Sequence, residues 1–131
     1  MFAAGEFGVD LAEKLAEHFD LPGNRSLVRS RRDKQYQQDL IASKGLRSVR
    51  QAAGSEFAEV EPFLTTESFP LVVKPLESAG SVGVKMCYSL EESREHFHTW
   101  MKSEMISGAE CPRVVCQELL KGNEFVVDHV S

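Results

Sequence analysis

The chain has 131 residues, of which 42% are hydrophobic and 27% charged, a composition ordinary for one globular domain and too short for two complete ones. The formal net charge of −5 at pH 7 gives no reason to expect nucleic acid as a partner, and the basic cluster from Arg25 to Lys34 is local and interrupted by Asp33. No apolar stretch approaches the roughly 18 residues that a membrane-spanning helix needs, so we expect no membrane partner.

Residues 8–19 have the spacing of an amphipathic helix. Their apolar side chains fall on one stripe, formed by Leu11, Ala12, Leu15, Ala16 and Phe19. Pro22 and Gly23 then end the helix. The residues before it include no basic region and carry Glu6, which argues against a secretory signal and favours a cytoplasmic location.

A second helix is predicted over residues 30–45. Ser30 followed by Asp33 resembles a capping box at its start, and Gly45 suits its C-terminal stop. A short strand is expected next, at residues 46–52.

The middle of the chain changes from helical to strand-like patterns. A short helix is predicted at 55–64, where Pro62 should weaken the later half. The β-branched run at 71–74 predicts a strand, and the run at 83–88 is its expected hairpin partner. A short loop of small residues between two such runs favours antiparallel pairing.

A third clear helix is predicted near residues 90–103. Ser89 and Glu92 form a capping box at its start. Its core-facing side chains are predicted to be Leu90, Phe97, Trp100 and Met101. We therefore expect this helix to pack on the sheet.

Two further strands are predicted at 113–120 and 124–130, separated by a turn that contains Gly122. The three cysteines are Cys87, Cys111 and Cys116. They form no CxxC pair, which fits free thiols in a reducing compartment, and two of them fall in strand-like runs where a small buried hydrophobe is expected. Helices near one face of an antiparallel sheet make an α+β domain.

The loop between the strands at 71–74 and 83–88 has a composition that suits phosphate. Its small residues are Ser78, Ala79, Gly80, Ser81 and Gly83. They permit close backbone approach, and exposed amide N–H groups suit phosphate oxygens. Lys74 ends the first strand, so its ammonium can stand beside whatever the loop covers. A plain hairpin connection with a surface lysine remains the alternative.

Familiar nucleotide and metal motifs do not fit the spacing. The P-loop is excluded because Gly80 and Gly83 lie too close together and Lys85 is followed by Met86. The GxGxxG fingerprint is absent, and the four histidines lack metal-ligand spacing. We therefore assign no metal ligand and no catalytic residue.

A second signal lies just past the turn at 121–123. Strand alternation places Glu124 and Asp128 on one face. The Glu124 carboxylate can accept hydrogen bonds from the hydroxyls of a sugar. A solvated glutamate at the sheet edge is the alternative.

Four segments together, in this order, resemble the ATP-grasp superfamily. They are RRDK at 31–34, VVKPLESAGSVGV at 72–84, VVCQELL at 114–120 and KGNEFVVDHVS at 121–131. Runs such as GVDLAEKLA at 8–16 are similar to carboxylate–amine ligases of the carnosine-synthase and L-amino-acid-ligase type. The resemblance implies an ATP-grasp-like α+β fold, with the antiparallel sheet and its helices forming the nucleotide-binding subdomain.

The resemblance also implies residue roles. Lys34 and Lys74 would contact the ATP phosphates, and the loop at 78–83 would close over them as a lid. The adenine-reading linker would comprise Gln117, Glu118, Leu119 and Leu120. In it, the carbonyl of Glu118 would meet the adenine amino group and the amide of Leu120 a ring nitrogen. Glu124 would hold the ribose hydroxyls. Gln117 stands where the family often has glutamate, so an uncharged carbonyl would replace a carboxylate.

The implied chemistry is ATP-dependent joining of a small-molecule carboxylate to an amine or thiol through an acyl phosphate. ATP and Mg²⁺ are the implied cofactors, and the magnesium ligands are expected in a lobe beyond Ser131. Residues 1–23 are expected to be the tail of a preceding α/β domain, and residues 24–131 the N-terminal part of an ATP-grasp domain, incomplete at its C-terminus. This piece alone is expected to be inactive.

Two other interpretations stay open: a non-catalytic nucleotide-binding or regulatory module of the same fold, and a small α+β interaction domain. The oligomeric state and the acid and amine that are joined do not follow from the sequence.

Overall fold

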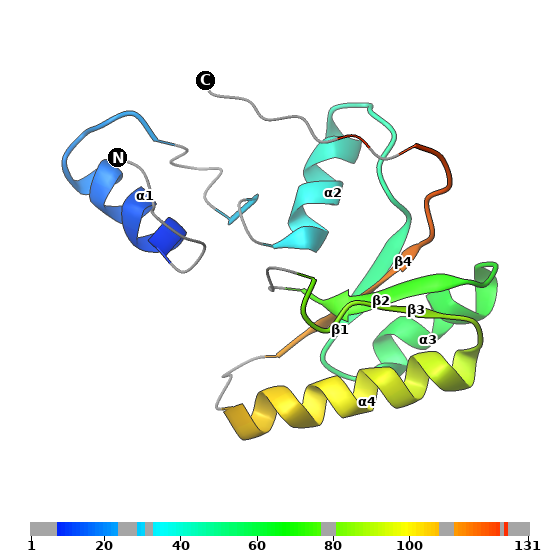
Figure 1. Ribbon diagram of the computed structural model, residues 1–131. Coiled ribbons are helices and arrows are strands. Elements are labelled where there is room, and N and C mark those ends of the chain that lie inside the picture. The colour runs from blue at the N-terminus through cyan, green and yellow to red at the C-terminus, as the bar shows by residue number, and fades with distance from the viewer. Residues whose placement is uncertain are drawn as a thin grey trace.

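A computed structural model describes residues 8–23, 29–30, 33–76, 81–107, 112–123 and 125. The elements are α1 (Val9–His18), α2 (Lys34–Ser43), β1 (Gln51–Gly54), α3 (Phe57–Thr66), β2 (Leu71–Pro75), β3 (Lys85–Cys87), α4 (Leu90–Ser107) and β4 (Val114–Glu118). Their order matches the prediction through β4 (Figure 1). The strand predicted at 124–130 falls on residues that, apart from Phe125, lie outside the described part.

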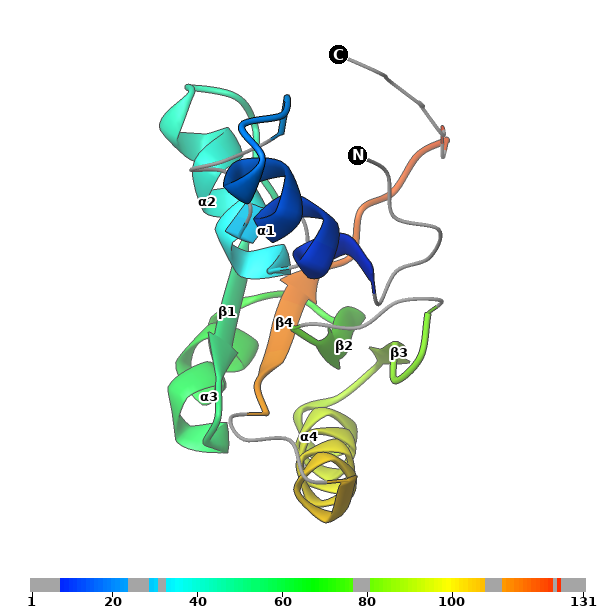
Figure 2. The same ribbon diagram turned by 90° about the vertical axis from the view of Figure 1, so that its left-hand side faces the viewer.

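The strands form one four-stranded sheet in the order β1-β4-β2-β3, with every neighbouring pair antiparallel. β2 and β3 are the predicted hairpin, with Leu71 opposite Cys87. β4 lies between β1 and β2, so Val73 is opposite Cys116 across the second of these pairs. Figures 1 and 2 show α4 along one side of the sheet and α2 on the other.

The hydrophobic core lies between the sheet and the helices α3 and α4. Its most deeply buried side chains include Val60, Leu64, Leu71, Val73, Phe97, Val114 and Cys116. Leu71 and Val73 alternate with less buried residues along β2, as a strand with one core-facing side requires. The predicted face of α4 is confirmed, because Phe97 and Met101 are buried and Leu90 and Trp100 pack against the same cluster.

Helix α2 begins four residues later than predicted. Its N-cap is Asp33, whose carboxylate accepts from the N–H of Tyr36 at 2.8 Å. The Ser30/Asp33 capping box was therefore wrong, because Asp33 fills the cap position itself rather than the third helical one. Gly45 is confirmed as the stop: its φ is 72°, and its N–H donates to the carbonyl of Ala42 at 2.9 Å.

Two other predicted boundaries were wrong. β1 starts at Gln51, not at residue 46, because the N–H groups of Val49 and Arg50 donate to the side chains of Gln38 and Glu118 and not to a neighbouring strand. α3 continues through Pro62 to Thr66, two residues beyond its predicted end, so the proline does not end the helix. The hydroxyls of Thr65 and Thr66 each donate to the carbonyl of Pro62 at 3.0 Å and so add bonds in the turn after the proline.

α1 forms as predicted, but its apolar stripe is only partly covered. Ala16 is buried, whereas Leu11 and Phe19 are 61% and 60% exposed. Within the described residues, no helix is long and apolar enough to cross a membrane.

Cys87 and Cys116 are free and buried in the core, as predicted. Burial raises the pKa of both thiols, that of Cys116 to about 12. Cys111 lies outside the described residues.

Candidate functional site

The face of the sheet opposite the core carries polar side chains. Strand alternation puts Val72 and Lys74 on this side, because Leu71 and Val73 point into the core. Lys74 lies opposite Val115 of β4. Burial removes part of the water around its ammonium group and lowers the pKa of Lys74 below its usual value. A partly desolvated lysine is therefore a candidate for binding an anion.

The second predicted lysine reaches the same end of β2 from another element. Lys34 is the first residue of α2, and its Nζ donates to the carbonyl of Leu76 at 3.0 Å. Leu76 follows Lys74 by two residues, and its N–H is fixed by the carbonyl of Arg113 at 2.9 Å. The structure therefore brings Lys34 to the strand end that carries Lys74.

Asp33 anchors the start of α2 and with it the position of Lys34. Its side chain is 5% exposed and forms an ion pair of 2.7 Å with Arg29. Burial alone would raise the pKa of Asp33, but the N–H of Tyr36 and the Arg29 guanidinium outweigh burial and leave that pKa below its usual range. The cap therefore stays ionised at neutral pH.

Gln117 ends a short chain of amide hydrogen bonds on the polar face. Its Nε2 donates to Oε1 of Gln51 at 2.8 Å, and Nε2 of Gln51 donates to the carbonyl of Gln35 in α2 at 3.0 Å. The two glutamines face each other across β1 and β4. This chain ties α2 to the sheet and directs the Gln117 amide nitrogen toward β1.

Glu118 is the last residue of β4 and is the centre of a charged cluster. Its carboxylate is 9% exposed and accepts from Nη2 of Arg47 at 3.0 Å and from Nη2 of Arg50 at 2.8 Å. Arg50 also forms two hydrogen bonds with Glu67, of 2.8 and 2.9 Å. The guanidinium of Arg50 lowers the pKa of Glu67. The cluster connects the residues just before β1 to the last residue of β4.

The linker after β4 borders an open cavity of about 810 Å³. Its lining residues are Arg47, Leu119, Leu120, Lys121, Gly122 and Asn123. This size lies within the usual range for small-molecule sites, about 300–1,000 Å³. Leu120 is 56% exposed, so an apolar side chain is available to a planar ligand.

The described end of the glycine-rich loop is held tightly. Ser81 and Gly83 have positive φ values of 60° and 73°. A Cβ on Gly83 would lie 2.6 Å from the Trp100 ring and 2.7 Å from Pro75, so only glycine fits. His96 Nε2 is 2.8 Å from the carbonyl of Gly83. Ser78, Ala79, Gly80 and Glu124 lie outside the described residues.

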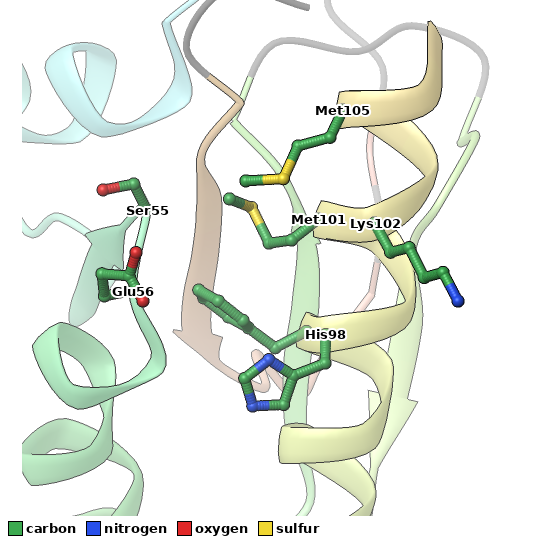
Figure 3. Close-up of a pocket in the computed structure, with 7 residues that line it drawn as sticks. Ser55, Glu56, His98, Met101, Lys102 and Met105 are labelled. Atoms are coloured by element: carbon green, nitrogen blue, oxygen red, sulfur yellow. The ribbon is translucent and has the colours of Figure 1, made fainter.

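A separate pocket of about 430 Å³ lies on the core side of the sheet. It is lined by Ser55, Glu56, Phe97, His98, Met101, Lys102 and Met105. Figure 3 shows Met101 and Met105 directed toward the α3 start, while the Lys102 side chain points away from it. None of the predicted nucleotide residues lines this pocket, so it is not the candidate site.

The sequence did not predict the roles of Arg47, Arg50 and His96. Both arginines fall within the strand predicted at 46–52, and nothing in the local pattern shows that their side chains reach Glu118. Within the described ranges, no group of three or more His, Cys, Asp or Glu side chains could hold a metal ion. We therefore assign no Mg²⁺ ligand to these residues.

The fold and the polar face define an ATP-grasp-type domain: an antiparallel sheet with helices on both sides, two lysines at one strand end and a linker beside a cavity. Residues 32–131 match the family described as "Phosphoribosylglycinamide synthetase, ATP-grasp (A) domain", and the chain belongs to this family. The resemblance to the ATP-grasp superfamily is thereby confirmed.

Individual relatives are longer than this chain. Dapdiamide A synthase of Enterobacter agglomerans is 31% identical over 134 aligned positions, which cover 100% of this chain and 32% of that protein. The crystal structure of VanG D-Ala:D-Ser ligase from Enterococcus faecalis superimposes with a TM-score of 0.71 at 17% identity, covering 90% of this chain and 34% of that one. The L-amino acid ligase from Bacillus licheniformis gives a TM-score of 0.62 at 22% identity, covering 84% and 26%. The chain thus spans about a third of its curated relative.

Proposed function

We propose that this chain binds ATP on the polar face of the sheet, as the nucleotide-binding part of an ATP-dependent carboxylate–amine ligase. The observation that carries the proposal is that Lys34, the first residue of α2, reaches the end of β2, the strand that also carries Lys74. One ammonium is held at the carbonyl of Leu76, and the other is partly buried two residues earlier. Two cations from different elements at one strand end suit a polyphosphate.

In this proposal the nucleotide runs from the β2 end to the β4 linker. Lys34 and Lys74 hold the phosphates, and the loop that starts after Leu76 covers them. The carbonyl of Glu118 and the amide of Leu120 read the adenine edge. Leu119 and Leu120 border the cavity in which a base can lie. Ser81, Gly83 and the undescribed loop residues Ser78 to Gly80 form the lid, and Glu124 holds the ribose.

The Gln117 side chain would contribute to adenine binding without charge. Its amide nitrogen is engaged by Gln51, so the carbonyl end of the amide is the part available to a ligand. Because this acceptor is neutral, its hydrogen bond to the adenine amino group is weaker than one from a carboxylate.

The reaction we propose for the parent ligase proceeds through an acyl phosphate. A substrate carboxylate oxygen attacks the γ-phosphorus of ATP, ADP leaves, and an amine then attacks the acyl carbon and releases inorganic phosphate. The lysines of this chain bind and orient the phosphates and offset their negative charge. A magnesium ion, when bound, would add further charge neutralisation to the transferring group.

The substrate class follows from relatives and not from this chain's own residues. One relative is named a synthase of dapdiamide A, and one structural neighbour is an L-amino acid ligase. We propose a small carboxylate and an amine as the substrates. The family match begins at residue 32, which supports our proposal that α1 belongs to a unit distinct from the ATP-grasp domain.

The test is nucleotide binding by the full chain, measured by isothermal titration and by the shift in thermal unfolding. ATP at a hundred times its Kd should stabilise the protein by about 2.7 kcal/mol. Lys74→Met should abolish most of this shift, whereas Lys102→Met, an exposed lysine on the core-side helix, should retain it. A folded wild-type chain that shows neither heat nor a shift with ATP would contradict the proposed function.

A further inference from the structure

The ladder between β1 and β4 is altered at its open end. Gln51 lies opposite Gln117, so the next pair outward is Arg50 and Glu118. In a regular antiparallel ladder, a hydrogen-bonded pair exchanges two N–H···O=C bonds. Here the N–H of Glu118 donates to the carbonyl of Arg50 at 3.0 Å, but the N–H of Arg50 donates to Oε1 of the Glu118 side chain at 2.9 Å. The carboxylate has taken the place of the main-chain carbonyl.

Ion pairs hold the Glu118 carboxylate in this position. The Glu118 carboxylate is pinned by Arg47 on one oxygen and by Arg50 on the other, at 3.0 and 2.8 Å. Glu67 in turn fixes the Arg50 guanidinium through two bonds. Charge-assisted hydrogen bonds are shorter and stronger than neutral ones, and a network holds the side chain in one rotamer. The Arg50 N–H therefore donates to the Glu118 side chain and not to the Glu118 main-chain carbonyl.

We propose that the Glu118 carboxylate is a positioning group for recognition of the nucleobase. By accepting the Arg50 N–H, it keeps the Glu118 main-chain carbonyl out of the β1–β4 ladder and open to a donor from the ligand. The inference rests on the proposed ATP site, and it assigns that site a preference for 6-aminopurine nucleotides. A 6-amino group donates to the carbonyl, whereas a 6-oxo group presents a second acceptor to it.

The surroundings of Glu118 agree with this role. Residues Leu119 and Leu120 follow it directly and line the open cavity, as does Arg47, while Glu118 itself lines an adjoining pocket of about 210 Å³ together with Arg50 and Leu119. The carboxylate that releases the carbonyl is thus also the group that holds Arg47 at the cavity wall. A single side chain links strand pairing, cavity shape and the acceptor offered to the base.

The experiment compares Kd values of the full chain for ATP, inosine triphosphate and inorganic tripolyphosphate by isothermal titration. Wild type should bind ATP more tightly than inosine triphosphate. Glu118→Ala lets the Arg50 N–H return to the main-chain carbonyl, so the ratio of the two Kd values should fall about tenfold. Affinity for tripolyphosphate should not change. A merely structural defect would weaken all three ligands together.

Two further variants complete the test. Glu118→Gln keeps a side-chain carbonyl that can accept from the Arg50 N–H but loses the charge that pairs with Arg47 and Arg50, so its ratio should lie between those of wild type and Glu118→Ala. Glu67→Ala removes the two bonds that fix the Arg50 guanidinium but leaves the Glu118 carboxylate and Arg47 in place, so it should lower the ratio less than Glu118→Ala does. If Glu118→Ala does not fold, Glu118→Asp carries the test, because its shorter side chain withdraws from the Arg50 N–H while keeping the charge.

The outcomes separate the two proposals. Wild type that binds ATP, with an unchanged ATP-to-inosine-triphosphate ratio in Glu118→Ala or Glu118→Asp, overturns the inference and leaves the proposed function standing. Wild type that does not bind ATP at all contradicts the proposed function itself. A Glu118→Gln ratio that falls below that of Glu118→Ala also overturns the inference, because a side-chain acceptor would then lower the ATP preference instead of supporting it.

Discussion

The two faces of the sheet use the same strands for opposite purposes. Toward α3 and α4, side chains such as Leu71, Val73 and Phe97 are buried in an apolar cluster. Toward α2, the alternate positions carry Lys74 and Gln117 beside the buried Val115, and side-chain hydrogen bonds help to connect the elements. Burial of apolar area stabilises the first face, whereas the second keeps a partly desolvated cation at a cost to stability. The contrast agrees with our proposal that the polar face binds a nucleotide.

The largest effect is expected on the apolar face. Phe97→Ala removes a side chain that is 1% exposed and leaves a cavity between α4 and the sheet. We expect the free energy of unfolding to fall by about 3–5 kcal/mol, measured by urea denaturation. Glu95→Ala, an exposed change on the same helix, should stay within about 0.5 kcal/mol of wild type. Equal effects in the two variants would mean that the apolar cluster does not hold the domain together.

On the polar face, the same measurement should give the opposite result. Lys74→Met removes a buried ammonium, so the free energy of unfolding should be unchanged or higher. Binding of ATP, in contrast, should lose about 2–4 kcal/mol because the phosphates lose a cation. Titration calorimetry and denaturation on the same preparation separate the two quantities. Unchanged ATP affinity would move the phosphates elsewhere on the chain.

Gly83 lies in the loop between β2 and β3, close to Trp100 of α4. Gly83→Ala forces a Cβ against Trp100 and Pro75 in a left-handed backbone conformation. We expect a loss of about 1–3 kcal/mol in thermal or urea unfolding. Gly45→Ala is the matched control, because Gly45 has a similar φ of 72° and nothing within 4 Å of its Cβ position. If both variants lose the same amount, backbone strain alone explains the effect and the contacts do not.

The cap of α4 should change stability without touching the nucleotide. Ser89 Oγ accepts from the N–H of Glu92 at 3.2 Å, and the Glu92 carboxylate accepts from the N–H of Tyr88 at 2.7 Å. Ser89→Ala should cost about 1 kcal/mol in unfolding. Its Kd for ATP should equal that of wild type, as should that of Ser103→Ala, an exposed control. A changed Kd in Ser89→Ala alone would show that the helical layer takes part in binding.

The smallest effect is a pH dependence that only the polar face provides. The pKa of Lys74 in the folded chain lies below its ordinary value of 10.5, so the unfolded chain binds this proton more tightly. Stability therefore rises with pH between the folded pKa and about 10.5. Wild type should gain stability relative to Lys74→Met over that range in parallel denaturation series. A constant difference between the two would show that Lys74 is fully solvated.

The sequence predicted best where periodicity and end signals agreed. The hairpin of β2 and β3 and the helix α4 combine clear alternation or helical spacing with a recognisable start, and both were confirmed. The start of α2 was misplaced because Asp33 is equally suited to two positions in a cap. Pro62 was given too much weight, because the burial of Phe57, Val60 and Leu64 against the core holds α3 together on both sides of the proline.

The site was less accessible to sequence reasoning than the fold. Lys34 and Lys74 were proposed through motif resemblance, and the structure was needed to show that Lys34 reaches the carbonyl of Leu76, two residues after Lys74. The pairing of Arg47 and Arg50 with Glu118 joins residues 71 and 68 positions apart. No local rule on charge spacing covers such a distance, because the contact depends on which strands become neighbours.

The position of β4 between β1 and β2 has a consequence for how the chain is made. Synthesis from the N-terminus produces β1 first, and its only partner in the sheet is the last described strand. On the ribosome, the hairpin of β2 and β3 can therefore close early, while β1 must wait until residues 114–118 emerge from the exit tunnel. Until then, the edges of β1 and β2 that β4 will cover stay unpaired, and unpaired strand edges favour association with other chains.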